Sequence, residues 1–383
     1  SSEKKYKNLF ITGMARTGST LLEKALHNHP ELAIASQPFP YIYTEVKSKF
    51  LAKEDISTDY PLENYFLKGE SGLKKFYKFL DSYEFAKDFV VKQLKEMKSY
   101  SGQYTHKLSS EKYWSFIKRG SFEDIYKSLV SIVAKYFKKK DASYYGTKEV
   151  FCEEYLPYIL KKVEGARGVI IVRDPRDVIT SLNYGQYKDH SGKRRPMLFD
   201  VRNWRKSIAF AIYLEKASHF KLIKYENLVR KFYGVMSELT DFFDVQDFPE
   251  GTFSEGIRDQ DGNIWSGNSS FGNKDFVNAS SIGRYQDRLS EATINFIEAT
   301  CYPELKYLGY DLSIDGFQKK YVGQFSPPFQ ITRDFPADYS VAEENSSLEI
   351  QRFHNLTEKG PNEFESDKWF IFPEVYKKLR EAI

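Results

Sequence analysis

Cysteine is scarce in this chain of 383 residues, which carries only Cys152 and Cys301. The two lie far apart, without the spacing of a metal site or the density of a disulfide framework. The sequence therefore predicts a protein of a reducing compartment, with no disulfide scaffold and no metal site.

Long apolar runs are also missing, since none approaches the roughly 18 residues that a membrane span needs. The chain begins at Ser1 without Met, which leaves room for a signal or anchor segment before it. Glycosylation sequons begin at Asn268, Asn278, Asn345 and Asn355 and are compatible with a secretory route. We expect a cytoplasmic protein without membrane insertion, with the Golgi lumen as the alternative if an N-terminal anchor has been removed.

An excess of one charge sign is absent as well. Lys and Arg number 57 against 53 Asp and Glu, which gives a net charge of +4. This balance disfavours a protein that coats nucleic acid or an anionic membrane, so any anion site must be local. The apolar share of 41% and the charged share of 29% are those of a globular chain, whose length allows one large α/β domain or two smaller ones.

Three short apolar runs, separated by helical stretches, predict the fold. They lie at residues 8–12, 168–172 and 220–224 and are continuous rather than alternating, as in strands that are covered on both faces. Helical patterns follow the first two runs at residues 19–28 and 175–183. The alternation predicts an α/β fold in which helices flank a doubly wound parallel sheet.

Two longer stretches lie outside this frame. Residues 43–145 have helical periodicity and are too long for a simple crossover, so we expect a helical insertion on the carboxyl edge of the sheet, where ligands bind. After residue 312, aromatic residues recur among prolines. We expect a main domain over residues 1–312 and a C-terminal appendage over 313–383, acting as a lid, as a dimer arm or as an extended segment that wraps the core.

The loop after the first run reads Gly-Met-Ala-Arg-Thr-Gly-Ser-Thr, from Gly13 to Thr20. Gly13 and Gly18 allow successive N–H groups to face one anion, and the start of the next helix adds partial positive charge. An ordinary glycine turn with Ser19 as N-cap is the alternative. A magnesium-dependent phosphate loop has Lys where Ser19 stands, so this loop fits a phosphate held by Ser19, Thr20 and Arg16 without a metal.

A second candidate anion site follows the second run. Arg173 ends the predicted strand, and Ser181 lies eight residues further on, in the next helix. A guanidinium and a hydroxyl have the chemistry to hold one further phosphate. The alternative is a structural salt bridge, in which Asp174 or Asp177 pairs with Arg173 or Arg176.

Five segments, in order, resemble the sulfotransferases that use 3′-phosphoadenylyl sulfate (PAPS), which have a P-loop-type α/β fold. The resemblance runs from about residue 8 to residue 312 and is nearest to the bacterial-type and tyrosylprotein-like branch. The segments read GMARTGSTLLEKAL with NHPELAIASQPF, GTKEVFCEEYLPYILKKVEGARGVIIVRDPRDVITSL, WRKSIAFAIYLEKASHFKLIKYENLVRK, WSGNSSF, and SSIGRYQDRLS ending in PELKYLGYDL.

The resemblance implies roles for the matching residues. It makes Lys148, near the transferred group, and Arg16 the catalytic residues; the alternative for Lys148 is a surface lysine paired with Glu149. It assigns the 3′-phosphate to Arg173 and Ser181. It assigns binding of the 5′-phosphosulfate to Arg16, Thr17, Gly18, Ser19 and Thr20. Binding of the adenosine side is assigned to Tyr225, Ser269, Ser270 and Arg284.

This sequence departs from the family's pattern at two places. Arg16 stands where many members have Lys. Ser36 and Gln37 stand where the tyrosylprotein-like branch has a Glu after the His-Pro segment, and an amide cannot accept the proton. The general base therefore stays open among Glu45, His106, His190 and Glu149.

The implied reaction is an in-line, metal-independent transfer of the sulfuryl group from PAPS to a hydroxyl, less readily to an amine, with adenosine 3′,5′-bisphosphate (PAP) as the product. The acceptor would be a small molecule, a carbohydrate or a peptide rather than nucleic acid, and a homodimer is compatible with the appendage. One alternative is a P-loop kinase or hydrolase, which the missing lysine disfavours. Another is a non-catalytic PAP- or PAPS-binding module, which Gln37 and Arg16 keep open.

Overall fold

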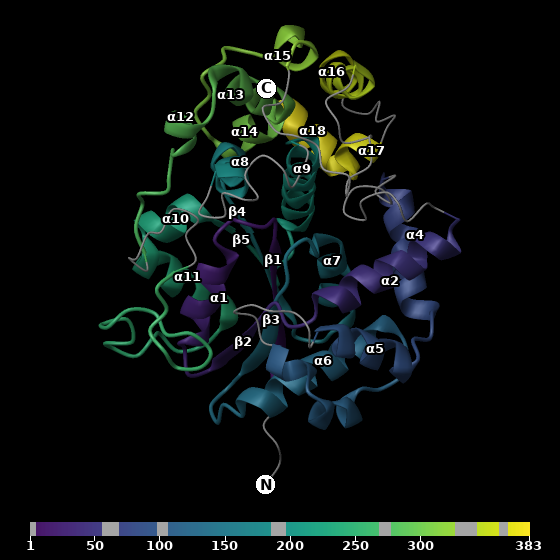
Figure 1. Cartoon of the computed structure of the whole chain (residues 1–383), viewed down its shortest axis with the longest axis vertical. Coiled ribbons are helices and arrows are strands. Elements are labelled where there is room, and N and C mark those ends of the chain that lie inside the picture. The colour runs from purple at the N-terminus through teal and green to yellow at the C-terminus, as the bar shows by residue number, and fades with distance from the viewer. Residues whose placement is uncertain are drawn as a thin grey trace.

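A five-stranded parallel sheet lies at the centre of the protein (Figure 1). A computed structural model describes residues 5–55, 69–97, 106–184, 197–267, 277–325, 343–359 and 367–383. The strand order is β2-β3-β1-β4-β5, and each neighbouring pair is parallel. This order, with crossovers to both sides of β1, confirms the predicted doubly wound α/β fold. The strands are β1 (Lys7–Gly13), β2 (Leu32–Ser36), β3 (Tyr144–Lys148), β4 (Arg167–Val172) and β5 (Phe220–Lys224).

The three apolar runs of the sequence are β1, β4 and β5, so these predicted strands are confirmed. The sequence does not predict β2 and β3. β3 reads Tyr-Tyr-Gly-Thr-Lys and shows no apolar run, although all five residues are buried. Gly146 is required in this strand, because a side chain there would collide with the backbone of Leu9 in β1.

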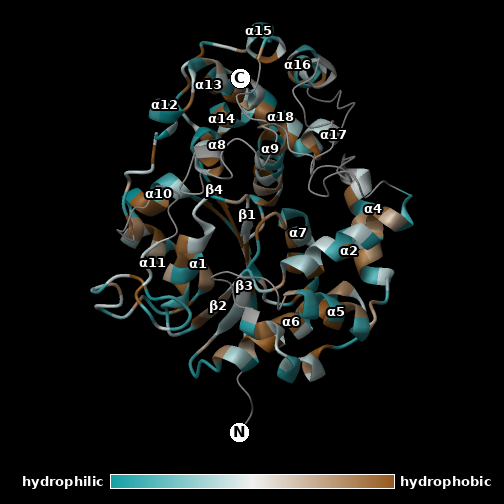
Figure 2. Ribbon diagram, in the orientation of Figure 1, coloured by the Kyte–Doolittle hydropathy of each residue, from teal (hydrophilic) through white to brown (hydrophobic). Residues whose placement is uncertain are grey.

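Three helices cover one face of the sheet, on the left in Figure 1. They are α1 (Ser19–His27), α10 (Tyr225–Arg230) and α11 (Phe232–Phe243). Figure 2 shows apolar residues along α1 and α11, and these pack with strand residues such as Leu9, Ile11 and Ile171. The helix predicted at residues 19–28 is confirmed as α1.

The opposite face carries the helices on the right in Figure 1 and those above them. Residues 43–145 lead from β2 to β3, and α6 packs on both strands. α6 thus covers a face of the sheet, and the last two residues of the stretch, Tyr144 and Tyr145, belong to β3. An insertion at the carboxyl edge stays a prediction for the rest of the stretch. The helices are α2 (Pro40–Lys53), α4 (Gly69–Ser82), α5 (Lys87–Met97), α6 (Phe122–Phe137), α7 (Leu156–Lys162), α8 (Pro175–Tyr184) and α9 (Met197–Leu214), with 3-10 turns at His106–Ser109, Glu111–Phe116 and Glu153–Tyr155.

The chain ends in helices that pack on α9. Residues after 312 that the structure describes are largely helical rather than extended, and Phe370, Phe372 and Tyr376 join the main apolar cluster. Glu349 forms ion pairs with Arg202 and Arg205 of α9. The boundary at 312 and the role of a lid or dimer arm stay predictions. The helices are α12 (Tyr285–Arg288), α13 (Glu291–Thr300), α14 (Tyr302–Leu308), α15 (Lys319–Gly323), α16 (Glu343–Glu358), α17 (Asp367–Phe370) and α18 (Pro373–Glu381).

Within the described ranges, every helix is too short or too polar to cross a membrane.

Candidate functional site

The glycine loop connects the carboxyl end of β1 to the start of α1. Gly13 and Gly18 have φ angles of 150° and 89°, which side chains rarely adopt. A side chain at Gly13 would also collide with the carbonyl oxygen of Ile171, and one at Gly18 with the ring of Tyr225. The two glycines are therefore required by close packing on β4 and on α10, as well as by the turn itself.

Three residues without the freedom of glycine also have positive φ angles at this edge of the sheet. Arg16, Gln37 and Phe151 have φ angles of 65°, 42° and 59°, and they follow β1, β2 and β3 respectively. Such backbone strain concentrates at functional sites, because the surrounding structure must hold it in place. The carboxyl ends of these strands are thus the candidate site on backbone grounds as well.

Lys148 ends β3 and reaches the start of α1. Its Nζ lies 3.3 Å from Oγ1 of Thr20, and its side chain is buried. Burial lowers the pKa of Lys148, while the negative charges of Glu23 and Glu149 act to raise it. The alternative of a surface lysine is wrong, since this ammonium group faces the first turn of α1.

The two candidate anion sites form one connected cluster. Nε of Arg16 donates to Oγ of Ser181 over 2.9 Å, and Nη1 of Arg173 donates to the carbonyl oxygen of Arg16 over 3.1 Å. The glycine loop after β1 and the segment after β4 therefore lie in direct contact. Sequence spacing gave no sign of this contact, because the residues are 157 and 165 positions apart.

Arg173 also stacks on an aromatic ring. Its guanidinium carbon lies 4.4 Å from the ring centroid of Tyr225, and Nη2 donates to the carbonyl oxygen of Ser281 over 3.0 Å. The Tyr225 hydroxyl and Oγ of Ser281 are 2.5 Å apart. Nε of Arg173 is buried and has no hydrogen-bond partner within the described part of the chain. A buried donor without a partner is unusual and indicates a missing acceptor.

The salt bridge that was the alternative for this segment exists, but it involves Arg176 rather than Arg173. Arg176 pairs with Asp174 over 2.7 Å and with Glu298 over 2.6 Å. Asp177 accepts the N–H groups of Gly283 and Tyr285, and burial raises its pKa to about 6. These contacts leave Arg173 to the loop cluster and hold the segment around Ser281 beside it.

The remaining predicted residues differ in how far the structure places them. Ser19 is buried at the start of α1, and the Thr17 hydroxyl donates to the carbonyl oxygen of Met14. Nε of Arg284 donates to the carbonyl oxygen of Ser280 in its own turn. Ser269, Ser270 and His190 lie outside the described residues. Ser281 was not predicted, although it belongs to the quoted SSIGRYQDRLS segment, which is the signal that could have found it.

Among the candidate bases that the structure describes, Glu149 alone lies at the strand ends. It follows Lys148 directly, its side chain is buried, and its Oε1 accepts the N–H of Phe39 over 2.8 Å. Burial raises the pKa of Glu149 to about 8. Glu45 lies on α2, half-buried, and His106 begins the 3-10 turn before α6.

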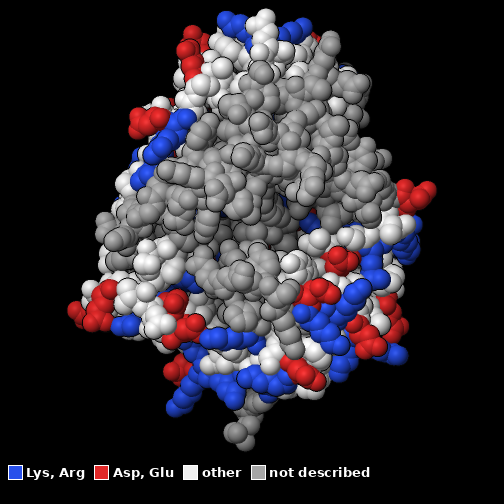
Figure 3. All heavy atoms as spheres, viewed as in Figure 1, with Lys and Arg blue, Asp and Glu red and all other residues white. Residues whose placement is uncertain are grey.

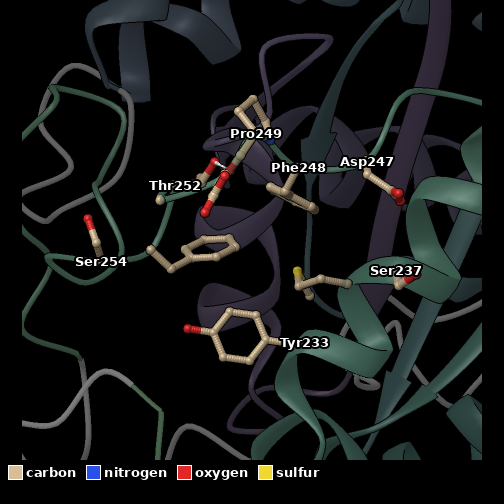
Figure 4. Close-up of a pocket in the computed structure, with 11 residues that line it drawn as sticks. Tyr233, Ser237, Asp247, Phe248, Pro249, Thr252 and Ser254 are labelled. Carbon is tan, nitrogen blue, oxygen red and sulfur yellow. Dashed lines mark hydrogen bonds between the residues drawn. The ribbon is translucent and has the colours of Figure 1, made fainter.

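A separate cavity of about 440 Å³ opens between α11 and residues 247–254 (Figure 4). None of the predicted site residues that the structure describes lines it. Figure 3 shows basic and acidic side chains side by side around the rim of one face. Over the described ranges, no group of three or more His, Cys, Asp or Glu residues has the geometry to hold a metal ion.

The sequence signature of the sulfotransferase family matches residues 8–250, so the chain belongs to this family. No curated protein matches the chain. A sulfotransferase domain from the curacin biosynthetic pathway aligns with a TM-score of 0.46 and 19% identity, over 81% of this chain and 100% of that one. Mouse sulfotransferase SULT7A1, in complex with PAP, aligns with a TM-score of 0.38 and 10% identity, over 78% of this chain and 85% of that one. The match of the family signature confirms the predicted family.

Proposed function

We propose that the protein transfers the sulfuryl group from PAPS to a hydroxyl acceptor, without a metal ion. The observation that carries the choice of donor is the Arg173 cluster. The buried Nε of Arg173 has no acceptor within the described part of the chain. The guanidinium group lies over the ring of Tyr225, and this contact holds its orientation. A 3′-phosphate on the donor would supply that acceptor, and Ser181 and Arg16 lie beside it.

The resemblance supports roles for the other residues, and the described positions of some of them are compatible with these roles. The 5′-phosphosulfate would lie over the start of α1, held by Arg16, Thr17, Gly18, Ser19 and Thr20. Lys148 would stabilise the charge that grows on the departing phosphate oxygen, because its Nζ already contacts Thr20. The adenosine would lie along Tyr225, with Ser269, Ser270 and Arg284 as further candidates.

The decisive test is the transfer of labelled sulfate from PAPS across a panel of alcohols, phenols, sugars and tyrosine peptides. We expect transfer to at least one hydroxyl acceptor, unchanged by a metal chelator. Phosphoryl transfer from ATP with magnesium, and none from PAPS, would instead support the kinase alternative. The acceptor class, a homodimer and the cytoplasmic location remain predictions from the sequence.

The presence of Gln37 supports one other candidate function, that of a non-catalytic module that binds PAP or PAPS. Gln37 occupies the place of the family's glutamate, and its N–H donates to the carbonyl oxygen of Lys148 over 2.8 Å. Tight binding of PAP by a protein that transfers sulfate to no acceptor, water included, would identify this module.

A further inference from the structure

Glu149 is a buried carboxylate with unusually few partners. Its side chain is 1% exposed, and the N–H of Phe39 is the one hydrogen-bond donor that it meets within the described ranges. No ion pair to Lys, Arg or His is formed by Glu149 among those residues. Burying a carboxylate costs folding free energy unless an ion pair or hydrogen bonds compensate for the lost water. The few contacts of Glu149 do not provide this compensation, which indicates a functional role.

The other buried glutamates near these strand ends have the partners that Glu149 lacks. Glu153 and Glu154 both pair with Lys206, at 3.2 and 3.1 Å, and Glu154 also pairs with Lys47 at 2.9 Å. Glu226 accepts the N–H of Asp174 at one oxygen and the hydroxyl of Tyr310 at the other. Their surroundings account for their burial by ordinary ion pairing or hydrogen bonding, whereas those of Glu149 do not.

The position of Glu149 bears directly on the missing base. The turn between β2 and α2 contains Gln37, which is bonded to the backbone of Lys148, and Phe39, which is bonded to the carboxylate of Glu149. This is the turn in which the resemblance expects a glutamate and the sequence has an amide. A carboxylate therefore lies against this turn after all, supplied by the end of β3 instead of by the turn itself.

The groups around Glu149 suit a proton acceptor. Lys148 precedes it on the strand end, and the negative charge of Glu149 acts to raise the pKa values of two buried neighbours, Tyr43 of α2 and Cys152. Burial raises the pKa of Glu149 to about 8, and Lys148 opposes this shift. A base whose pKa lies near the working pH combines an available ionised form with a strong pull on the proton.

We propose that Glu149 is the general base of sulfuryl transfer, an inference that rests on the proposed function. The acceptor oxygen forms a bond to sulfur while the bond from sulfur to the bridging phosphate oxygen breaks, and that oxygen keeps the electron pair. The acceptor proton passes to the Glu149 carboxylate and leaves to water afterwards. Lys148 stabilises the negative charge on the departing oxygen, and Glu149 removes the proton from the attacking oxygen. Two adjacent residues at the end of β3 would thus assist the leaving group and the nucleophile.

The test compares Glu149→Gln with the wild type, using labelled PAPS with water as the acceptor and with any acceptor from the panel. Gln keeps an oxygen for the Phe39 N–H but cannot take the proton. We expect kcat to fall by about 10²–10⁴-fold and the affinity for PAP to stay within about twofold. Glu164→Gln, an exposed change just before β4, is the control and should keep wild-type rates.

The pH profile separates a base from a structural residue. In the wild type, kcat should rise with pH and level off near the pKa of about 8. Glu149→Gln should lack this rise, and Glu149→Asp should keep it with a lower plateau. An Asp variant without the rise would overturn the proposal, even if the Gln variant does not fold.

The outcomes also distinguish this proposal from the proposed function. Near-wild-type turnover by Glu149→Gln, or a loss of PAP affinity as large as the loss of rate, overturns the role of Glu149 and leaves sulfuryl transfer intact. Tight PAP binding without transfer by the wild type overturns catalysis and with it the base. A wild type that neither binds PAP nor uses PAPS overturns the proposed function itself.

Discussion

The ammonium group of Lys148 lies buried at the end of β3, against the first turn of α1. We predict that Lys148→Ala lowers kcat by about 10²–10³-fold, the loss seen when one donor to a developing negative charge is removed. Affinity for PAP should change far less, because the charge that Lys148 meets grows only as the bridging oxygen leaves. Steady-state kinetics and calorimetry on the same preparation check both. An equal loss of affinity and rate would make Lys148 a binding residue.

Gly18 is fixed by two separate constraints, its φ angle of 89° and the ring of Tyr225. Gly309 has a similar φ angle of 75° and open space around it, so Gly309→Ala is a matched control for backbone strain alone. We predict that both alanine variants lose about 1–2 kcal/mol of stability from strain, and that Gly18→Ala loses more. Only Gly18→Ala should also weaken PAP binding, since Tyr225 must move. Equal PAP affinity of the two variants would contradict the close packing.

At the scale of elements, α8 and the segment that precedes α12 are joined through Asp177. Its carboxylate accepts the N–H groups of Gly283 and Tyr285, which places Ser281 beside Arg173. We predict that Asp177→Ala weakens PAP binding by about tenfold, the effect of losing roughly one charged hydrogen bond. Asp287→Ala, an exposed change in α12, should leave calorimetric PAP affinity unaltered. Wild-type affinity of Asp177→Ala would show that the segment holds its place without this carboxylate.

The sequence alone predicts the elements whose residues follow a simple rule. β1, β4 and β5 are continuous apolar runs, and α1 follows a glycine loop. The local sequence is therefore enough to predict these four elements. β3 is not, because Lys148 and its neighbours are buried by the helices that cover both faces, not by their own hydrophobicity. The hydrogen bond from Arg16 to Ser181 and the position of Ser281 depend on which strands are neighbours in the sheet. The local sequence does not predict the order of the strands.

At the scale of the whole molecule, Glu149 should make folding depend on pH. Its folded pKa of about 8 lies above the usual 4.5, so the folded state binds its proton more tightly than the unfolded state. The stability that this proton contributes is complete below about pH 4.5 and is lost as the pH rises to about 8. We predict that Glu149→Gln gains stability relative to the wild type across this window. Urea unfolding at pH 5 and at pH 8.5 checks it, and a constant difference would contradict it.

The C-terminal helices belong to the same folded body as the sheet, since Phe370, Phe372 and Tyr376 lie in the main apolar cluster. Glu349 of α16 is buried between Arg202 and Arg205 of α9, and these arginines hold its pKa at about 2. The segment after residue 312 is therefore tied to α9, the helix that follows the 3′-phosphate candidates along the chain. A truncation there would expose apolar core residues, not simply remove a lid.

The central claim is that Arg173 recognises the 3′-phosphate of the donor. Calorimetry of PAP and of adenosine 5′-phosphate on the wild type and on Arg173→Ala tests it most directly, with surface variant Arg258→Ala as the control. The wild type and Arg258→Ala should bind PAP much more tightly than the monophosphate, and Arg173→Ala should lose about 1.5–3 kcal/mol of PAP binding and most of that preference. Equal affinity of the wild type for the two nucleotides would contradict the account.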